Sequence, residues 1–305
     1  MENRVLFSST NGSPFGFLFF FFLVYFLEIM FKGLLPPTFK ETVHSWIKED
    51  IPSFDYGGYV VGDDIHEATL FAKSPGIISG IPFFTEVFNY LNCTVEWYIE
   101  EGASNTEKTK IATVRGPIRN ILMGERTALN IMTRCSGIST AAHTVVDLVR
   151  KEGWNGTVCA TRKTTPGFRL VEKYAVLVGG AATHRMDLSS MVMLKDNHVW
   201  ATGSIKDSVH KARDVCGFSS KIEVEVSSYE EAVEAIEAGA DVIMLDNFTP
   251  ETIHVVGEKL KKQYPHGITI HNIQSYLSPY IDVYSMGCLT QGYSCMDLSL
   301  KVNKD

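Results

Sequence analysis

The chain has 305 residues, of which 45% are hydrophobic and 21% charged, and its formal net charge is −7 at pH 7. This is enough apolar material to bury a core in one or two domains. Nucleic acid binding needs a broad basic face to neutralise phosphates, so an acidic chain argues against a nucleic acid partner.

Residues 1–33 form an apolar leader, whose most hydrophobic run extends from Phe15 to Phe31. A run of this kind is typical of a signal or anchor segment, and it predicts membrane attachment only if the leader is retained. Against an anchor, Glu28 interrupts the run, which is shorter than the ~20 apolar residues that a span prefers. The six cysteines include no Cys-x-x-Cys pair, which favours a reducing compartment. We therefore expect a cytoplasmic protein, with a membrane-anchored form as the alternative.

Residues 34–130 predict a smaller α+β domain. The segment "LLPPTFKETVHSWIKEDIP" indicates a helix that begins after a proline pair, and a second, amphipathic helix is expected near Pro82 to Leu91. The segments "CTVEWYIEEG" and "KIATVRGP" alternate apolar and polar residues as sheet strands do.

Residues 131–305 change to short apolar strands that alternate with helices. The expected strands are "GTVCATR", "YAVLVGG", "MVMLKDN", "KIEVEVS", "DVIMLDN" and "IDVYSMG". Between the fourth and fifth, a capping box from Ser227 to Glu230 begins a helix that ends at Gly239. This alternation predicts an α/β fold in which the second domain is a (β/α) TIM-like barrel.

Polar residues close most of these predicted strands. In a (β/α) barrel the carboxyl ends of the strands line one mouth, where active sites are built. The stretch from Thr161 to Lys195 also holds six Lys or Arg against two acids, which favours a small anionic ligand. The candidate residues at the mouth are Arg162, Lys163, Lys195, Asp196, Asn197, Glu225, Asp246 and Asn247.

Several of the charged residues have a simpler interpretation. Arg169 and Lys173 flank Glu172 on a predicted helix, which favours a solvated face over ligand contact. Lys221 and Glu223 alternate on one strand and are expected to form a satisfied pair inside the barrel.

Two further alternatives concern the strand ends. The pair His184-Arg185 follows "VGGAAT" and is consistent with simple strand termination. A lone lysine at a strand end, Lys195, is also compatible with a Schiff-base aldolase.

The sequence from Leu34 to Val302 resembles the quinolinate phosphoribosyltransferase family (nicotinate-nucleotide pyrophosphorylase, carboxylating). The motifs that carry the resemblance are "GERTALNIMTRCSGIST", "TRKTTPGFRLVEKYAVLVGGAATHRMDL", "MVMLKDNHV", "EVEVSS", "DVIMLDNF" and "IDVYSMGCLTQ". The resemblance implies a pentosyltransferase that joins quinolinate to phosphoribosyl pyrophosphate (PRPP). Its products are nicotinate mononucleotide, pyrophosphate and CO₂, and its cofactor is Mg²⁺.

The resemblance also implies roles for individual residues. It places Lys163, Glu225 and Asp246 in catalysis, with Glu225 and Asp246 near the metal of Mg-PRPP. It further implies a homodimer, or a hexamer built from dimers, in which Arg126 reaches the partner's site. The implied substrate-binding residues are Arg126, Arg162, His184, Arg185, Lys195, Gly267 and Gly287.

One segment departs from the family pattern. The family has a strand and a Ser-Gly-Gly turn for the ribose phosphate before "GIT", whereas here "EKLKKQYP" passes through His266 directly into "GITIHNI". Gly267 is what remains of that turn. We therefore expect an incomplete barrel with a shortened strand near residues 264–269, and the alternative function is a weakly active or inactive assembly subunit.

Overall fold

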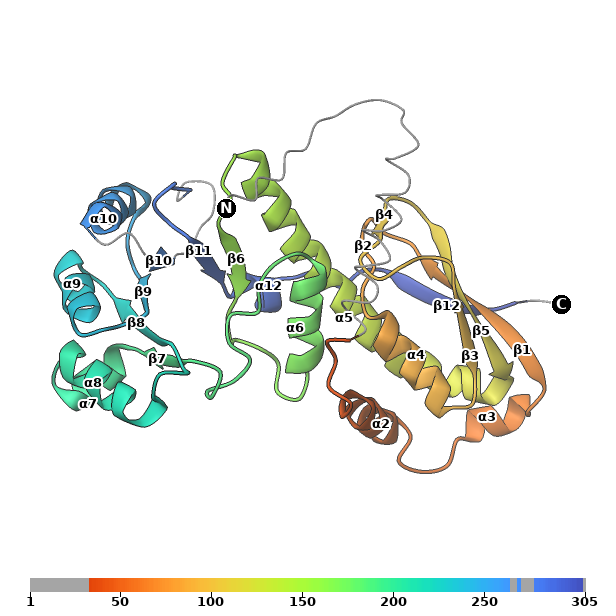
Figure 1. The fold of residues 1–305 in the computed structure, drawn as a ribbon. Helices are drawn as coiled ribbons and strands as arrows, with labels where there is room; N and C mark the ends of the chain where they lie inside the picture. The colour runs from red at the N-terminus through yellow and green to blue at the C-terminus, as the bar shows by residue number, and fades with distance from the viewer. Residues whose placement is uncertain (1–32, 264–267, 270–276, 304–305) are drawn as a thin grey trace.

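The computed structural model describes residues 33–263, 268–269 and 277–303. The predictions for the apolar leader and for Gly267 lie outside these residues. Figure 1 shows two groups of elements on either side of one long helix, α5 (Ile118–Lys151). Within the described ranges, no helix is long and apolar enough to cross a membrane.

The N-terminal group is a four-stranded antiparallel sheet packed against helices. The strand order is β12-β1-β5-β3, and a separate pair, β2 and β4, lies beside it. The strands are β1 (Ile65–Ala72), β2 (Gly76–Ile77), β3 (Thr94–Trp97), β4 (Ser104–Asn105), β5 (Thr109–Pro117) and β12 (Leu298–Val302). The helices are α2 (Phe39–Asp50), α3 (Tyr56–Val61) and α4 (Ile81–Tyr90).

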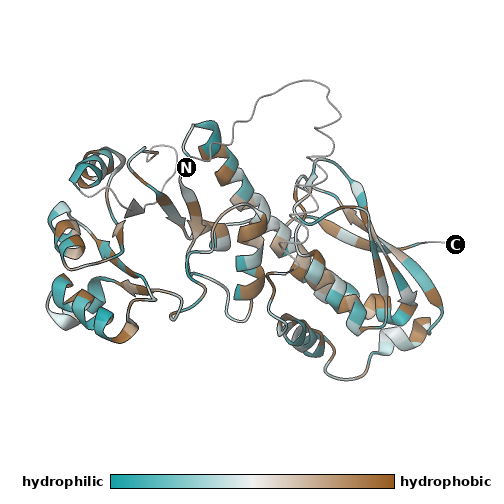
Figure 2. Cartoon of the chain, viewed as in Figure 1, coloured by the Kyte–Doolittle hydropathy of each residue, from teal (hydrophilic) through white to brown (hydrophobic). Residues whose placement is uncertain are grey.

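Close packing of α4 on α5 forms the centre of this domain. Phe83, Phe84 and Phe88 of α4 are fully buried. Gly124 of α5 lies directly against Phe88, because a Cβ atom there would stand 2.9 Å from the Phe88 ring. Figure 2 shows hydrophobic residues along both helices, and deleting such buried rings costs about 3–5 kcal/mol each.

The expected division of the chain at residue 130 differs from the structure in two respects. The boundary falls inside α5, a continuous helix that packs against elements of both groups. The last strand, β12, was assigned to the barrel but pairs with β1 in the N-terminal sheet, with Leu300 opposite Leu70. Both leucines are buried there, so the burial of apolar side chains explains why the last strand belongs to the N-terminal sheet.

The second group is a parallel six-stranded sheet flanked by helices, with strand order β6-β11-β10-β9-β8-β7. The strands are β6 (Thr157–Ala160), β7 (Val192–Leu194), β8 (Ile222–Val226), β9 (Val242–Leu245), β10 (Ile268–Thr269) and β11 (Val283–Met286). The helices are α6 (Arg169–Val178), α7 (Asp196–Thr202), α8 (Ile205–Cys216), α9 (Tyr229–Glu237), α10 (Pro250–Gln263) and α12 (Cys288–Gln291). The predicted α/β class with a smaller N-terminal domain is confirmed.

Two local predictions in this domain were wrong. The segment "YAVLVGG", expected as a strand, belongs to α6, because Val171, Tyr174 and Ala175 repeat at helical spacing and are buried. The helix cap is shifted by one residue: Ser228 accepts from the Glu231 N–H at 3.1 Å, whereas the expected box began at Ser227.

The shortened strand is present as β10, two residues long. Ile268 pairs with Ile243 of β9, and Thr269 pairs with Val283 of β11. The sheet therefore stays continuous across the segment where the chain departs from the family pattern.

Candidate active site

A cavity of about 290 Å³ opens at the carboxyl ends of the parallel strands. This is the end of a (β/α) sheet at which loops gather and active sites form. The cavity brings together seven of the site residues that the sequence predicted. The lining residues are Thr161, Arg162, Lys163, His184, Arg185, Met193, Lys195, Glu225, Met244, Asp246 and Ser285.

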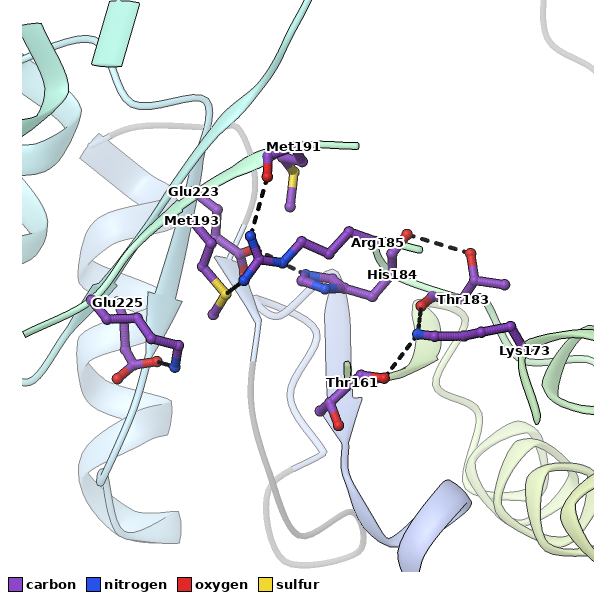
Figure 3. Close-up of polar contacts among 10 residues, drawn as sticks. Thr161, Lys173, Thr183, His184, Arg185, Met191, Met193, Glu223 and Glu225 are labelled. Atoms are coloured by element: carbon purple, nitrogen blue, oxygen red, sulfur yellow. Dashed lines mark hydrogen bonds and ion pairs between the residues drawn. The ribbon is translucent and has the colours of Figure 1, made fainter. Parts of the chain in front are cut away.

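The basic side of the cavity contains Arg162 and Arg185. The Arg162 Nη1 atom is buried and has no hydrogen-bond partner within the described part of the chain. Arg185 is only 8% exposed; its Nη1 donates to the Met191 carbonyl at 3.2 Å and its Nη2 lies 3.3 Å from the Met193 sulfur (Figure 3). Burial, and then the positive charge of Arg162, lower the pKa of Arg185. A buried Arg162 donor with no partner among the described residues, beside the buried Arg185, favours binding of an anion here.

His184 directly precedes Arg185 and contacts a buried acid. Its Nε2 is 2.9 Å from Oε2 of Glu223, whose side chain is fully buried. The His184 backbone has φ 57°, a left-handed conformation that non-glycine residues rarely adopt and that marks functional sites. The expected pair between Lys221 and Glu223 is therefore wrong: Lys221 is exposed, and Glu223 turns toward His184.

The opposite side of the cavity is acidic. Lys195 Nζ contacts the Glu225 carboxylate, and Asp246 follows directly after β9. The backbone N–H of Asp246 donates to the Val226 carbonyl at 3.0 Å, which fixes the end of β9 against β8. Asn247 then takes a left-handed backbone with φ 64°, so the chain turns sharply at the cavity rim.

The other predicted residues lie at different distances from the cavity. Lys163 is exposed at the rim, and Gly287 packs against it, because a Cβ atom at Gly287 would stand 3.2 Å from Lys163 Cδ. Arg126 is exposed on α5 and is not among the lining residues. Within one chain, the structure therefore does not bring Arg126 into the site.

Comparison with known proteins connects this cavity to one family. Residues 55–136 match the description "Quinolinate phosphoribosyl transferase, N-terminal domain", and residues 138–301 match its C-terminal domain. The nicotinate-nucleotide pyrophosphorylase [carboxylating] of Homo sapiens is 50% identical over 277 residues, covering 88% of this chain and 93% of the human protein. The chain belongs to the quinolinate phosphoribosyltransferase family.

Further relatives in the quinolinate phosphoribosyltransferase family agree in sequence and in structure. The Dictyostelium discoideum protein of the same name is 52% identical and covers 88% of this chain and 98% of its own length. The solved nicotinate-nucleotide pyrophosphorylase from Francisella tularensis has a TM-score of 0.80 at 30% identity, covering 88% of this chain and 98% of that one.

Sequence reasoning missed three buried charges beside this family's cavity. Glu172 and Lys173 were assigned to a solvated face of α6, yet they are 0% and 1% exposed. Their signal was weak because two adjacent charges inside a helix usually face water. The sequence predicted Lys221 as the partner of Glu223, whereas the structure gives His184. A better signal was available in α6, since Glu172 and Lys173 share their helical turn with the buried residues Val171 and Tyr174.

The residues at the acidic side fit a magnesium ion that arrives with a phosphorylated substrate. Among the described residues, no group of three or more His, Cys, Asp or Glu could enclose a metal. Glu225 and Asp246, however, line both the cavity and an adjoining recess of about 300 Å³. Mg²⁺ typically takes one or two carboxylates, with substrate phosphates and water as the other ligands. Two carboxylates at a shared edge satisfy that requirement.

Proposed function

We propose that this chain transfers phosphoribosyl from PRPP to quinolinate with decarboxylation, giving nicotinate mononucleotide, pyrophosphate and CO₂, a step of NAD biosynthesis. The observation that carries the proposal is the basic side of the cavity, where buried Arg185 and half-buried Arg162 line the same space of small-molecule size as the carboxylates of Glu225 and Asp246. Support also comes from relatives of about 50% identity along nearly their whole length.

Recognition of quinolinate follows from its two adjacent carboxylates. Each carboxylate requires several charge-assisted donors, and guanidinium groups supply paired bonds in a fixed geometry. Arg162 brings an unpaired buried donor, while His184 and Arg185 bring two more basic groups from a neighbouring segment. We assign Lys195 to the same set, between the carboxylates and Glu225.

The ribose would lie on the acidic side of the cavity. There the ring nitrogen of quinolinate displaces pyrophosphate through a transition state with positive charge on the sugar, which carboxylates such as Glu225 and Asp246 stabilise. A bound Mg²⁺ would supply charge neutralisation on the departing pyrophosphate. Lys163 at the rim is placed to contact phosphate oxygens, with Gly287 leaving room for its side chain.

Decarboxylation then needs no electron sink from the protein. Once the ring nitrogen carries the sugar, its positive charge stabilises the electron pair left on the adjacent carbon as CO₂ departs. A proton from water then bonds to that carbon and completes the product. The role of the cavity is to hold the ring and the remaining carboxylate. A Schiff base on Lys195 is not part of this scheme, since its amine contacts Glu225.

The alternative of an inactive assembly subunit is not supported. It depended on a missing phosphate turn and a shortened strand; β10 keeps the parallel sheet continuous, and the turn at Gly267 lies outside the described residues. The Homo sapiens and Dictyostelium discoideum relatives, at 50% and 52% identity, also carry the name of the enzyme.

Replacing Arg162 with Ala is expected to weaken quinolinate binding by roughly tenfold to a hundredfold, because each charge-assisted contact contributes ~1.5–3 kcal/mol. Isothermal titration of the folded protein with quinolinate measures this. Arg213→Ala is the matched control, since Arg213 pairs with Asp241 at the opposite ends of the strands. Equal affinity in the wild type and R162A would remove Arg162 from the site, and no binding by the wild type would contradict the proposed function.

We further propose a cytoplasmic enzyme that self-associates as a homodimer, or as a hexamer built from dimers, with no nucleic acid partner. Exposed Arg126 on α5 is then available to the cavity of the partner subunit. Membrane attachment would arise only through the apolar leader.

Mixing R126A with R162A tests the shared site. If Arg126 acts in the partner's cavity, randomly mixed dimers should regain about a quarter of wild-type activity, since half of them hold one site with both arginines. Activity is assayed after subunit exchange has been confirmed with two distinguishable tags. Complete inactivity of the exchanged mixture would place Arg126 outside the partner's site.

A further inference from the structure

Lys173 lies behind the basic side of the cavity and is itself 1% exposed. Its Nζ donates to the Thr161 carbonyl at 2.8 Å and also contacts the Thr183 carbonyl (Figure 3). Thr161 directly precedes Arg162, and Thr183 directly precedes His184. One buried ammonium group therefore joins the two backbone segments that carry the basic residues of the site.

Within the described ranges, few other hydrogen bonds join these two segments near Thr161 and Thr183. Behind the cavity, two backbone hydrogen bonds join β6 to the segment that follows α6. The Ala182 N–H donates to the Val158 carbonyl at 2.8 Å, and the Ala160 N–H donates to the Ala182 carbonyl at 2.9 Å. Among the described residues, no backbone hydrogen bond joins them beyond Ala182. Lys173 joins the two segments one residue further along, at Thr161 and Thr183, where they begin to separate toward the cavity.

Burial of the Lys173 ammonium group is energetically unfavourable, so filling space in the core does not explain a lysine at this position. Burial is the main cause that lowers its pKa to about 8, and the nearby cations Arg169 and Arg162 add to this, partly offset by Cys159 and Glu172. An apolar side chain of similar length would fill the same space without this penalty. What a lysine adds is the ability to donate to two carbonyl oxygens at once.

Other side chains of α6 hold the same loop. Glu172 Oε2 accepts from the Thr165 N–H at 3.0 Å, and Arg169 Nε donates to Thr164 Oγ1 at 3.0 Å. Glu172 and Arg169 of α6 thus hold the loop after Arg162. Of these three side chains of α6, Lys173 is the one that also contacts the segment carrying His184. This makes Lys173 the connection that sets their separation.

We propose that Lys173 is a positioning residue, which fixes the spacing between Arg162 and the His184-Arg185 pair so that both can grip one dicarboxylate. The inference rests on the proposed function, because it assigns those residues to quinolinate. Two adjacent carboxylates on a rigid ring have a fixed separation, so affinity depends on the separation of the groups that bind them. Lys173 does not touch the substrate and acts through the backbone of Thr161 and Thr183.

The test compares Lys173→Met with Val176→Ala. K173M keeps the length of the side chain and removes its donors, and it should weaken quinolinate binding by roughly tenfold to a hundredfold, as small misplacements of binding groups do. The KM for PRPP should rise less than the Kd for quinolinate, because two of its proposed contacts, Glu225 and Asp246, lie on β8 and after β9, away from the segment that carries Thr161 and Lys163. V176A shortens a fully buried side chain of the same helix and controls for general loosening.

The outcomes separate the inference from the proposed function. The inference is supported if K173M loses more affinity for quinolinate than for PRPP, while V176A binds quinolinate as tightly as the wild type does. The two variants should have similar melting temperatures. Wild-type quinolinate affinity in folded K173M overturns it, as does an equal loss for both substrates. If K173M does not fold, Lys173→Gln replaces it: the amide is one atom shorter and cannot keep both contacts, so the same selective loss of quinolinate affinity is expected. Absence of quinolinate binding by the wild type would overturn the proposed function and the inference together.

Discussion

Asp246→Asn is expected to lower kcat by roughly two orders of magnitude while changing quinolinate affinity by less than about twofold. Asp246 follows β9 on the acidic side of the cavity, across from the basic residues that we assign to the carboxylates. The substitution keeps the shape of the side chain and removes its charge. Its effect should therefore be felt mainly as positive charge develops on the sugar. Steady-state kinetics and quinolinate titration measure the two quantities separately.

Asp241→Asn is the matched control for this prediction. Asp241 precedes the same strand, where it accepts from Ile222 N–H at 2.8 Å and pairs with Arg213. We expect D241N to reduce stability and to leave kcat near that of the wild type. If D246N lost quinolinate affinity as severely as turnover, Asp246 would belong to the pyridine side and the division of the cavity would be wrong.

Glu223→Ala is expected to lower the free energy of unfolding by about 3–5 kcal/mol, because it leaves the buried charge of Arg185 uncompensated and removes the partner of His184. Glu223 is fully buried beneath His184, and its charge also offsets that of Arg185. Without it, a nearly buried imidazole and a buried guanidinium share the site with no acid behind them. Urea unfolding followed by circular dichroism measures the change.

Lys221→Ala distinguishes this arrangement from the pairing that the sequence favoured. Lys221 is exposed, so its removal should change the free energy of unfolding by no more than about 0.5 kcal/mol. Glu223→Gln, which keeps the volume of the side chain, shows how much of the effect is due to charge. A large loss in K221A, or a negligible one in E223A, would refute the contact between Glu223 and His184.

The residues of the cavity were predictable from sequence wherever they follow a parallel strand. Lys195 and Asp246 come directly after short apolar strands, Arg162 follows β6 by two residues, and Glu225 is the penultimate residue of β8; parallel strands place such positions at one edge of the sheet. Their chemical type then indicated an anion and a cationic transition state. This part of the site depends on strand order alone and needs no knowledge of packing.

The supporting residues were not predictable in the same way. Lys173 and Glu172 are buried because the loop before α6 and the segment after it close over them, which is a tertiary property of three separate stretches. Glu223 was assigned to Lys221 because neighbours on a strand are visible in sequence, whereas His184 comes from a distant segment. The return of β12 to the first sheet was missed for the same reason.

Turnover by the purified chain tests the central claim most directly. Quinolinate labelled in the carboxylate next to the ring nitrogen is supplied with PRPP and Mg²⁺, and nucleotide and released CO₂ are measured in the same reaction. The account predicts equal amounts of nicotinate mononucleotide, labelled CO₂ and pyrophosphate, and none of them when PRPP is omitted. Folded protein that binds quinolinate yet forms no nucleotide would contradict the account.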